Sequence, residues 1–301
     1  MIRTVVAGLD GSAESLAAAD WAARESALRG LPLTLLHVWE PVPEPMAQAP
    51  LLGGETLQYW SEKVPRETAE GIRLRHPGVE VLTEHVPGRP ADILTEAAKS
   101  AELLVLGSRG LSGIGGFMLG SVGLSVVAHA ERPVVLVRAG EQATDEHEPD
   151  PAGNPSTATR FRPVVLGLDT GAPDDSVLGF SFEEAARRET GLRVVASWNL
   201  PPYYVYGLSA DLEQHDRITR QKAAELAEVL GPWRQKYPSV DVVGISRSGS
   251  PANHLLDASR EASLVVVGRR VRRAPLGTHV GAVAHAVLHH CTAPVTVIPH
   301  S

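Results

Sequence analysis

The chain has 301 residues, 43% of them apolar and 21% charged, which predicts a globular protein with two domains of ordinary size. Its formal net charge of −7 argues against a nucleic-acid or anionic-membrane binder, because such proteins carry a basic excess that displaces counterions from phosphate. With one cysteine, Cys291, no signal peptide and no apolar run long enough to span a bilayer, the sequence predicts a cytoplasmic protein.

The first half of the chain alternates strands and helices. A short apolar run at residues 4–9 predicts a strand buried on both faces, and apolar residues at helical spacing predict a helix over 12–29. The further elements expected in this half are strands over 33–39, 79–86, 103–107 and 133–137, and helices over about 55–75, 90–100 and 121–130. Such alternation with short connections predicts a parallel, doubly wound α/β sheet.

The second half repeats the first. Residues 5–10 (VVAGLD) return as 164–169 (VVLGLD), an offset of 159, and the later Gly-Arg-Pro of residues 88–90 returns as Gly-Ser-Pro at an offset of 161. We interpret this as a tandem duplication, with domains at 1–140 and 161–301. Residues 141–160 are acidic and rich in Pro, Ser and Thr, which predicts a linker.

A glycine-rich loop follows the fourth strand, at the sheet edge where doubly wound folds bind ligands. Gly107 and Gly110 permit a positive φ and bring backbone N–H groups close to a ligand. Gly120 and Ser121 open a helix whose unpaired N–H groups form an anion site, and Ser121 adds a hydroxyl donor. The loop is long enough to wrap a polyphosphate, with glycines at 113, 115 and 116 in its tip.

Two residues after other strands extend this hypothesis. Asp10 places a carboxylate where a ribose hydroxyl or a base edge is bound, and Val38 offers its backbone to a base. Plainer interpretations stay open: the loop is a tight turn, Asp10 caps the following helix, and Val38 belongs to the core. The motifs of a P-loop ATPase and of a dinucleotide-dependent dehydrogenase are absent.

The pattern G-x2-G-x9-G-[ST], met by Gly107, Gly110, Gly120 and Ser121, resembles the ATP-binding signature of universal stress proteins. The Gly-Leu-Asp-Gly-Ser of residues 8–12, the Leu-His-Val-Trp of 36–39 and the Gly-x-Pro of 88–90 are also similar to that family. The likeness covers nearly all of both halves, as in tandem actinobacterial-type members.

The resemblance implies two tandem Rossmann-like domains of the adenine nucleotide alpha hydrolase-like type, each a five-stranded parallel sheet with helices on both faces. It also implies ATP, bound with Mg²⁺, and either a homodimer or a pairing of the two domains within the chain. Under this resemblance Asp10 holds the ribose and Val38 the adenine. The other residues that it assigns to the nucleotide are Gly8, Leu9, Gly107, Gly110, Gly120, Ser121 and Val122.

The second half departs from the signature. Asp169, Gly268 and Gly281 survive, but Val271 and Ala282 replace the second glycine and the serine. Valine disfavours a positive φ and adds bulk where phosphate is expected. The arginines at 269, 270, 272 and 273 either compensate with charge or form a solvated basic loop. We predict a weak nucleotide site here, or none.

The leading hypothesis is an ATP-binding regulator of stress adaptation or growth control, in which ATP is a bound signal and no residue is catalytic. The alternatives are an interaction module with a vestigial nucleotide site and a slow ATP-hydrolysing enzyme. No metal site is expected, because the His-His-Cys run at 289–291 lacks a partner cluster at ligand spacing. The protein partner is not specified by the sequence, and the aromatic run at 201–207 has no assigned role.

Overall fold

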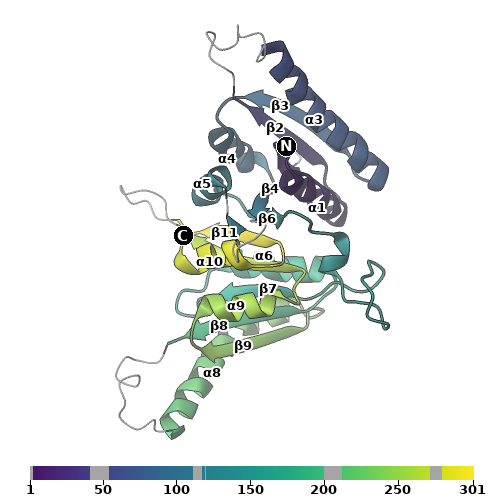
Figure 1. The fold of residues 1–301 in the computed structure, drawn as a ribbon. Helices are drawn as coiled ribbons and strands as arrows, with labels where there is room; N and C mark the ends of the chain where they lie inside the picture. Colours follow the sequence, from purple (N-terminus) through teal and green to yellow (C-terminus); the bar gives the residue numbers. More distant parts are fainter. Residues whose placement is uncertain (1–2, 41–53, 111–116, 119, 200–211, 272–279) are drawn as a thin grey trace. The chain divides into compact units, whose positions relative to one another are not determined.

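A computed structural model describes residues 3–40, 54–110, 117–118, 120–199, 212–271 and 280–301, which form two compact units that divide between Ala143 and Thr144 (Figure 1). The Pro-rich segment at 41–50, the loop tip at 111–116 and the aromatic run at 201–207 lie outside the described residues.

The first unit is a parallel sheet with the strand order β3-β2-β1-β4-β6. Its strands are β1 (Val5–Leu9), β2 (Leu33–Trp39), β3 (Val81–Pro87), β4 (Leu103–Gly110) and β6 (Val134–Arg138). A two-residue strand, β5 (Phe117–Met118), pairs antiparallel with the end of β4. All five residues of β1 are buried, as expected for a parallel strand covered on both faces.

Helices cover both faces of this sheet. They are α1 (Ala13–Arg29), α3 (Gly54–Arg75), α4 (Pro90–Ser100) and α5 (Ser121–His129). Helix α1 packs on β1 and β4 and contacts α3, whereas α4 contacts α5 and packs on β1, β2 and β4 (Figure 1). The largest buried side chain of α1, Trp21, is 1% exposed.

The second unit has the same topology, with the order β9-β8-β7-β10-β11 and all neighbours parallel. Its strands are β7 (Val164–Leu168), β8 (Leu192–Trp198), β9 (Val242–Ser248), β10 (Leu264–Arg270) and β11 (Val295–His300). Its helices are α6 (Asp175–Arg187), α8 (Leu212–Lys236), α9 (Pro251–Ser259) and α10 (Ala282–His290). The predicted fold class, two five-stranded parallel α/β units with helices on both faces, is confirmed.

The segment predicted as a linker, residues 141–160, contains more structure than its composition indicated. A 3₁₀ helix, η1, spans Ala143–Glu146. Glu146 and Arg162 then pair through their backbones (2.8 Å), as do Glu148 and Arg160 (3.0 Å), with an antiparallel bridge between His147 and Phe161. The stretch from Glu146 to Arg162 is therefore a closed hairpin.

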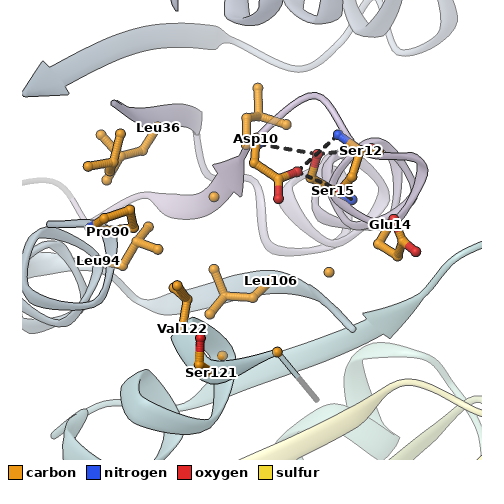
Figure 2. Close-up of a pocket in the computed structure, with 16 residues that line it drawn as sticks. Asp10, Ser12, Glu14, Ser15, Leu36, Pro90, Leu94, Leu106, Ser121 and Val122 are labelled. Atoms are coloured by element: carbon orange, nitrogen blue, oxygen red, sulfur yellow. Dashed lines mark hydrogen bonds between the residues drawn. The ribbon is translucent and has the colours of Figure 1, made fainter. Parts of the chain in front are cut away.

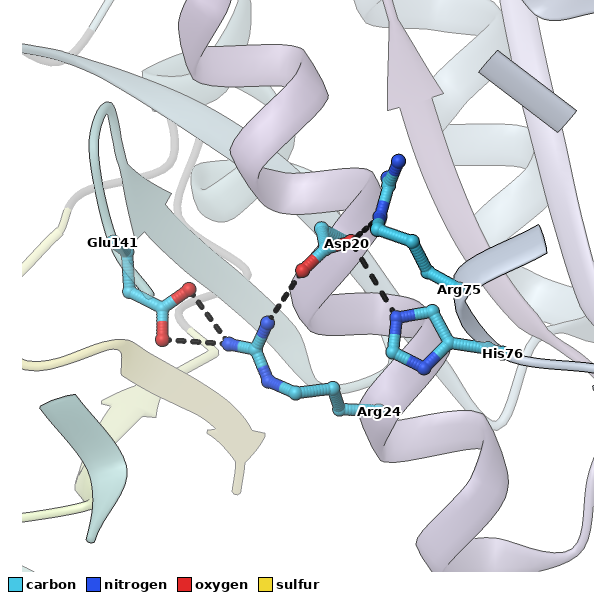
Figure 3. Close-up of polar contacts among 5 residues, drawn as sticks. All are labelled: Asp20, Arg24, Arg75, His76 and Glu141. Carbon is cyan, nitrogen blue, oxygen red and sulfur yellow. Dashed lines mark hydrogen bonds and ion pairs between the residues drawn. The ribbon is translucent and has the colours of Figure 1, made fainter. Parts of the chain in front are cut away.

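The start of this segment is fixed to α1 by an ion-pair network (Figure 3). Arg24 donates from one Nη to both carboxylate oxygens of Glu141 at 2.7 Å and from the other to Asp20 at 2.8 Å. Asp20 also accepts from Arg75 at 2.9 Å and lies 3.4 Å from His76 Nε2. Burial alone would raise the pKa of Asp20, but the hydrogen bond from Arg75 and the nearby positive charges hold that pKa below its ordinary value of 3.8.

Candidate functional site

A cavity opens at the carboxyl edge of the first unit's sheet, beside the ends of β1 and β4. The strand order reverses between these two strands, which is where doubly wound sheets place their ligands. The cavity has a volume of about 230 Å³, a little below the range of about 300–1,000 Å³ that is typical of small-molecule sites, and it is open to solvent. Its lining comes from β1, α1, β2, α4, β4 and α5 (Figure 2).

Asp10 follows β1 directly and belongs to both the cavity wall and the start of α1. Its Oδ1 accepts hydrogen bonds from the backbone N–H of Ser12 at 3.0 Å and from the Ser12 hydroxyl at 2.5 Å. The Ser12 hydroxyl in turn caps α1 by accepting from the N–H of Ser15 at 3.2 Å. The interpretation of Asp10 as the helix cap is wrong, because Ser12 is the N-cap of α1. The Asp10 carboxylate instead fixes the turn before the helix and lines the cavity.

Gly107 is needed for a close approach between two backbones. It lies in β4, in register with Val137, and has no positive φ. A Cβ at this position would lie 2.5 Å from the carbonyl carbon of Glu14 and 2.7 Å from the backbone nitrogen of Ser15. The expectation of a positive φ at Gly107 is wrong, because the glycine instead lets the first turn of α1 lie against β4.

Helix α5 presents an uncapped amino end to the cavity. Its N-cap, Gly120, has φ −60° and ψ 154°, so this glycine too has no positive φ, and no side chain caps the helix. A Cβ on Gly120 would meet no atom within 4 Å. Gly120, Ser121, Val122 and Gly123 all line the cavity. Unpaired N–H groups and the positive end of the helix dipole make such a turn an anion site.

Apolar side chains form one end of the cavity. Leu36 of β2, Leu94 of α4 and Leu106 of β4 are 2%, 6% and 5% exposed, and Val38 and Pro90 lie beside them in the lining. Figure 2 shows Leu36, Pro90 and Leu94 on one side of the cavity and Glu14 on the other. The site thus combines an apolar end with a polar end rich in hydrogen-bond donors.

The structure brings most of the predicted residues of the first unit to this one cavity. They are Gly8, Leu9, Asp10, Val38, Gly107, Gly120, Ser121 and Val122. Gly110 lies at the end of β4, where its backbone pairs with Phe117, and the glycines at 113, 115 and 116 lie outside the described residues. How the loop tip meets a polyphosphate therefore stays a prediction.

Sequence reasoning missed half of the lining. The residues concerned are Ser12, Glu14, Ser15, Leu36, Pro90, Leu94, Leu106 and Gly123. Some signal was available, because Pro90 and Leu94 lie one helical turn apart on α4 and so share a face. The polar members belong to the first turn of α1, which faces the carboxyl edge of the sheet in any fold of this kind.

The second unit is built differently at the corresponding place. Asp169 forms the same turn as Asp10, since its Oδ1 accepts from the N–H of Gly171 at 3.0 Å. Gly281 repeats Gly120 as the N-cap of α10, with φ −57° and open space around its Cα. Helix α6, however, begins only at Asp175, after Pro173, whereas the offset of 159 that relates Asp10 to Asp169 places the start of α1 at residue 172.

His300 lies where the missing helical turn would be. A Cβ on Gly268 would meet Nε2 of His300 at 2.8 Å and a methyl group of Val177 at 3.3 Å, whereas at Gly107 the neighbour is α1 backbone. The ring is 12% exposed, and its Nδ1 lies 3.6 Å from the carboxylate of Asp174, the N-cap of α6. An imidazole therefore covers the glycine of the second unit.

The basic run of the second unit is not a uniformly solvated loop. Arg269 lies in β10 and is 3% exposed, and burial lowers the pKa of its guanidinium group. Val271 is 40% exposed, while residues 272 and 273 lie outside the described part of the chain. Over the residues that the structure describes, no group of three or more His, Cys, Asp or Glu is arranged to hold a metal ion, and no helix is long and apolar enough to cross a membrane.

Sequence comparison identifies both halves of the chain. The profile of the universal stress protein family matches residues 1–138 and again residues 160–299. This chain belongs to the universal stress protein family. The family resemblance and the tandem repeat predicted from the motifs are confirmed.

Relatives extend the match over the whole chain. A universal stress protein of Mycolicibacterium smegmatis is 32% identical, covering 98% of this chain and 96% of its own. One from Mycobacterium tuberculosis is 33% identical, covering 99% and 97%. A solved universal stress protein from Archaeoglobus fulgidus superposes with a TM-score of 0.70 at 17% identity, covering 99% of this chain and 98% of that one, which supports the fold.

Proposed function

We propose that the first unit binds ATP in the cavity described above, and that the protein is a regulator of stress adaptation or growth control in which ATP is a bound signal. The observation that carries this proposal is that one cavity combines an apolar end with polar groups and the uncapped start of α5. An adenine base fits the apolar end, and a phosphate chain fits the start of the helix.

The residues that line the cavity indicate where each part of ATP would lie. The base would lie among Leu36, Val38 and Leu94, where it removes apolar surface from water. Asp10, between the two ends, would accept hydrogen bonds from the ribose hydroxyls. The phosphates would meet the backbone N–H groups at Ser121 and Val122, with Mg²⁺ at their far end.

We propose that the second unit binds ATP weakly or not at all. The delayed start of α6 and the His300 ring over Gly268 support this, in addition to the replacement of the motif glycine and serine. We also propose that the two domains of the chain span residues 1–140 and 161–301. A cytoplasmic location is proposed because the sequence has a single cysteine, Cys291, and therefore no intrachain disulfide.

Calorimetric titration of the full chain with Mg²⁺-ATP tests the proposal, and the duplication supplies a matched pair of variants. Asp10→Asn and Asp169→Asn make the same chemical change in the two units, and Asn can keep the turn that each Asp forms. We expect one equivalent of ATP, an affinity lowered about tenfold or more by Asp10→Asn, and no change with Asp169→Asn. Two equivalents of similar affinity would contradict the assignment to the first unit.

A second measurement separates a bound signal from a substrate. Nucleotide released from the purified protein is identified by mass spectrometry, and inorganic phosphate is followed after ATP is added. Co-purified ATP with no phosphate release supports the regulator, whereas ADP or AMP in its place would indicate slow hydrolysis. A chain that carries and binds no nucleotide would be an interaction module with a vestigial site.

A further inference from the structure

Glu14 is a carboxylate at the polar end of the cavity. It is the second residue of α1, it is half-buried, and it lines the cavity on the side away from Leu36 and Leu94 (Figure 2). Its backbone lies against Gly107, so its position relative to β4 is fixed. Among the residues that the structure describes, no hydrogen bond or ion pair to its side chain is found.

This carboxylate has one ordinary explanation. An acidic residue in the first turn of a helix interacts favourably with the positive end of the helix dipole. That explanation requires no contact with a ligand, and it predicts that nucleotide binding is indifferent to the residue. Glu14 lies on the cavity wall rather than on the outer face of α1, and the helix-dipole explanation does not account for that placement.

A carboxylate with no cation beside it is unfavourable next to a phosphate chain, because both groups are negatively charged. The uncapped start of α5 attracts anions to the cavity, and Asp10 and Glu14 add negative charge to its wall. Like charges a few ångström apart in a partly buried site repel each other strongly. A divalent cation between them reverses the sign of the interaction, and Mg²⁺ is commonly held by one or two carboxylates together with substrate phosphates.

We propose that Glu14 makes the binding of a nucleoside triphosphate depend on a divalent cation, which its carboxylate and the end of the phosphate chain hold together. The proposal rests on the proposed function, because it places the phosphates of ATP at this end. It assigns Glu14 a role in selecting the Mg²⁺-bound triphosphate over the free nucleotide. A nucleoside monophosphate lacks the end of the phosphate chain that holds the cation, so it should bind without this requirement.

The second unit has no carboxylate at the position that corresponds to Glu14. At the offset of 159 the residue that corresponds to Glu14 is Pro173, which precedes α6 and has no charge. The dependence on a cation is therefore a property of the first unit, and a difference between variants at position 14 reports on that unit in the intact chain.

The experiment compares ATP with AMP, each titrated into the full chain in Mg²⁺ and in EDTA, for the wild type, Glu14→Gln and the control Glu80→Gln. Glu80 is exposed and lies outside the cavity lining. In the wild type and the control we expect removal of Mg²⁺ to weaken ATP about tenfold or more, a difference of about 1.4 kcal/mol, and to leave AMP unchanged. In Glu14→Gln, free ATP should bind more tightly than in the wild type, and the Mg²⁺ dependence should fall to about threefold or less.

Electron paramagnetic resonance of Mn²⁺ gives a readout that does not depend on affinity alone. With ATP bound, the Mn²⁺ spectrum should differ between the wild type and Glu14→Gln, because one carboxylate ligand is exchanged for an amide. An unchanged Mg²⁺ dependence and an unchanged Mn²⁺ spectrum in Glu14→Gln would overturn the inference and leave only the helix-dipole role. If neither ATP nor AMP binds to the wild type, the proposed function itself fails, and the inference fails with it.

Discussion

Replacing Gly107 by alanine should damage both the stability of the first unit and its proposed nucleotide site. The new Cβ would lie 2.5 Å and 2.7 Å from backbone atoms of Glu14 and Ser15, which cannot rotate away, so α1 has to shift from β4. Overpacking of this kind costs about 1–3 kcal/mol, and the smaller entropy of an unfolded alanine chain offsets about 0.4–1 kcal/mol of it. We expect the free energy of unfolding of the first unit to fall by about 1–2 kcal/mol.

Two other glycines serve as control positions for this prediction. Gly78 and Gly120 have open space around the Cα and no positive φ, so alanine should change the stability at either position by less than about 0.5 kcal/mol. Gly120 lines the cavity at the proposed phosphate position, where a methyl group would take up space, whereas Gly78 lies outside the lining. Gly107→Ala should therefore lower stability and ATP affinity, Gly120→Ala should lower affinity alone, and Gly78→Ala should change neither.

Urea denaturation followed by circular dichroism, together with ATP titration, measures these quantities. Each variant is compared with the wild type, and the slope of the free energy against urea checks that the unfolded state is unchanged. If Gly107→Ala unfolds at the same urea concentration as Gly78→Ala, the backbone contact between α1 and β4 does not constrain this residue and the reasoning is refuted.

Three further substitutions test other parts of the structure. Because the pKa of Asp20 is lowered in the folded state, its ion pairs stabilise the protein above the ordinary pKa of 3.8, and the contribution is lost as the pH falls through the lowered pKa. Asp20→Asn should cost about 1 kcal/mol at pH 7, and this cost should shrink as the pH falls below 3.8. A pH-independent cost in urea titrations would contradict this. Phe182 is fully buried and stacks on Trp233 at 5.6 Å, so Phe182→Ala should lower the unfolding free energy of the second unit by about 3–5 kcal/mol, and a loss below about 1 kcal/mol would show that the core refills. His300→Ala exposes Gly268 and should cost about 1–3 kcal/mol in thermal unfolding, whereas an unchanged melting curve would mean that the ring does not support the second unit.

Most of the fold could be predicted because glycine and proline residues mark where helices end and begin. Helix α1 ends at Gly30, which has φ 63°, and α4 starts at Pro90, and both residues have a physical reason to be there. The continuation of β4 past Gly107 was not predicted, since two glycines three residues apart favour a turn. Only the pairing of β4 with β5 shows that the backbone stays extended.

The site was predicted less completely, because its decisive features depend on the packing of distant residues. The motif marks Gly107, but the reason for a glycine there is the backbone of α1, more than ninety residues away in the sequence. The difference between the two units depends on where α6 begins and on His300, which at the level of sequence is a histidine next to the last residue. Neither feature has a local sequence signal.

The hairpin that starts at Glu146 has a consequence for labelling and for proteolysis. Its two ends are paired by backbone hydrogen bonds, and its tip around Gly153 is exposed. A peptide inserted at this tip lengthens a loop that is already closed, at a small entropic cost, and leaves Glu141 and Arg24 as they are. The exposed tip is also where a protease is expected to cut first. The tip is therefore a natural position for a reporter or an affinity tag.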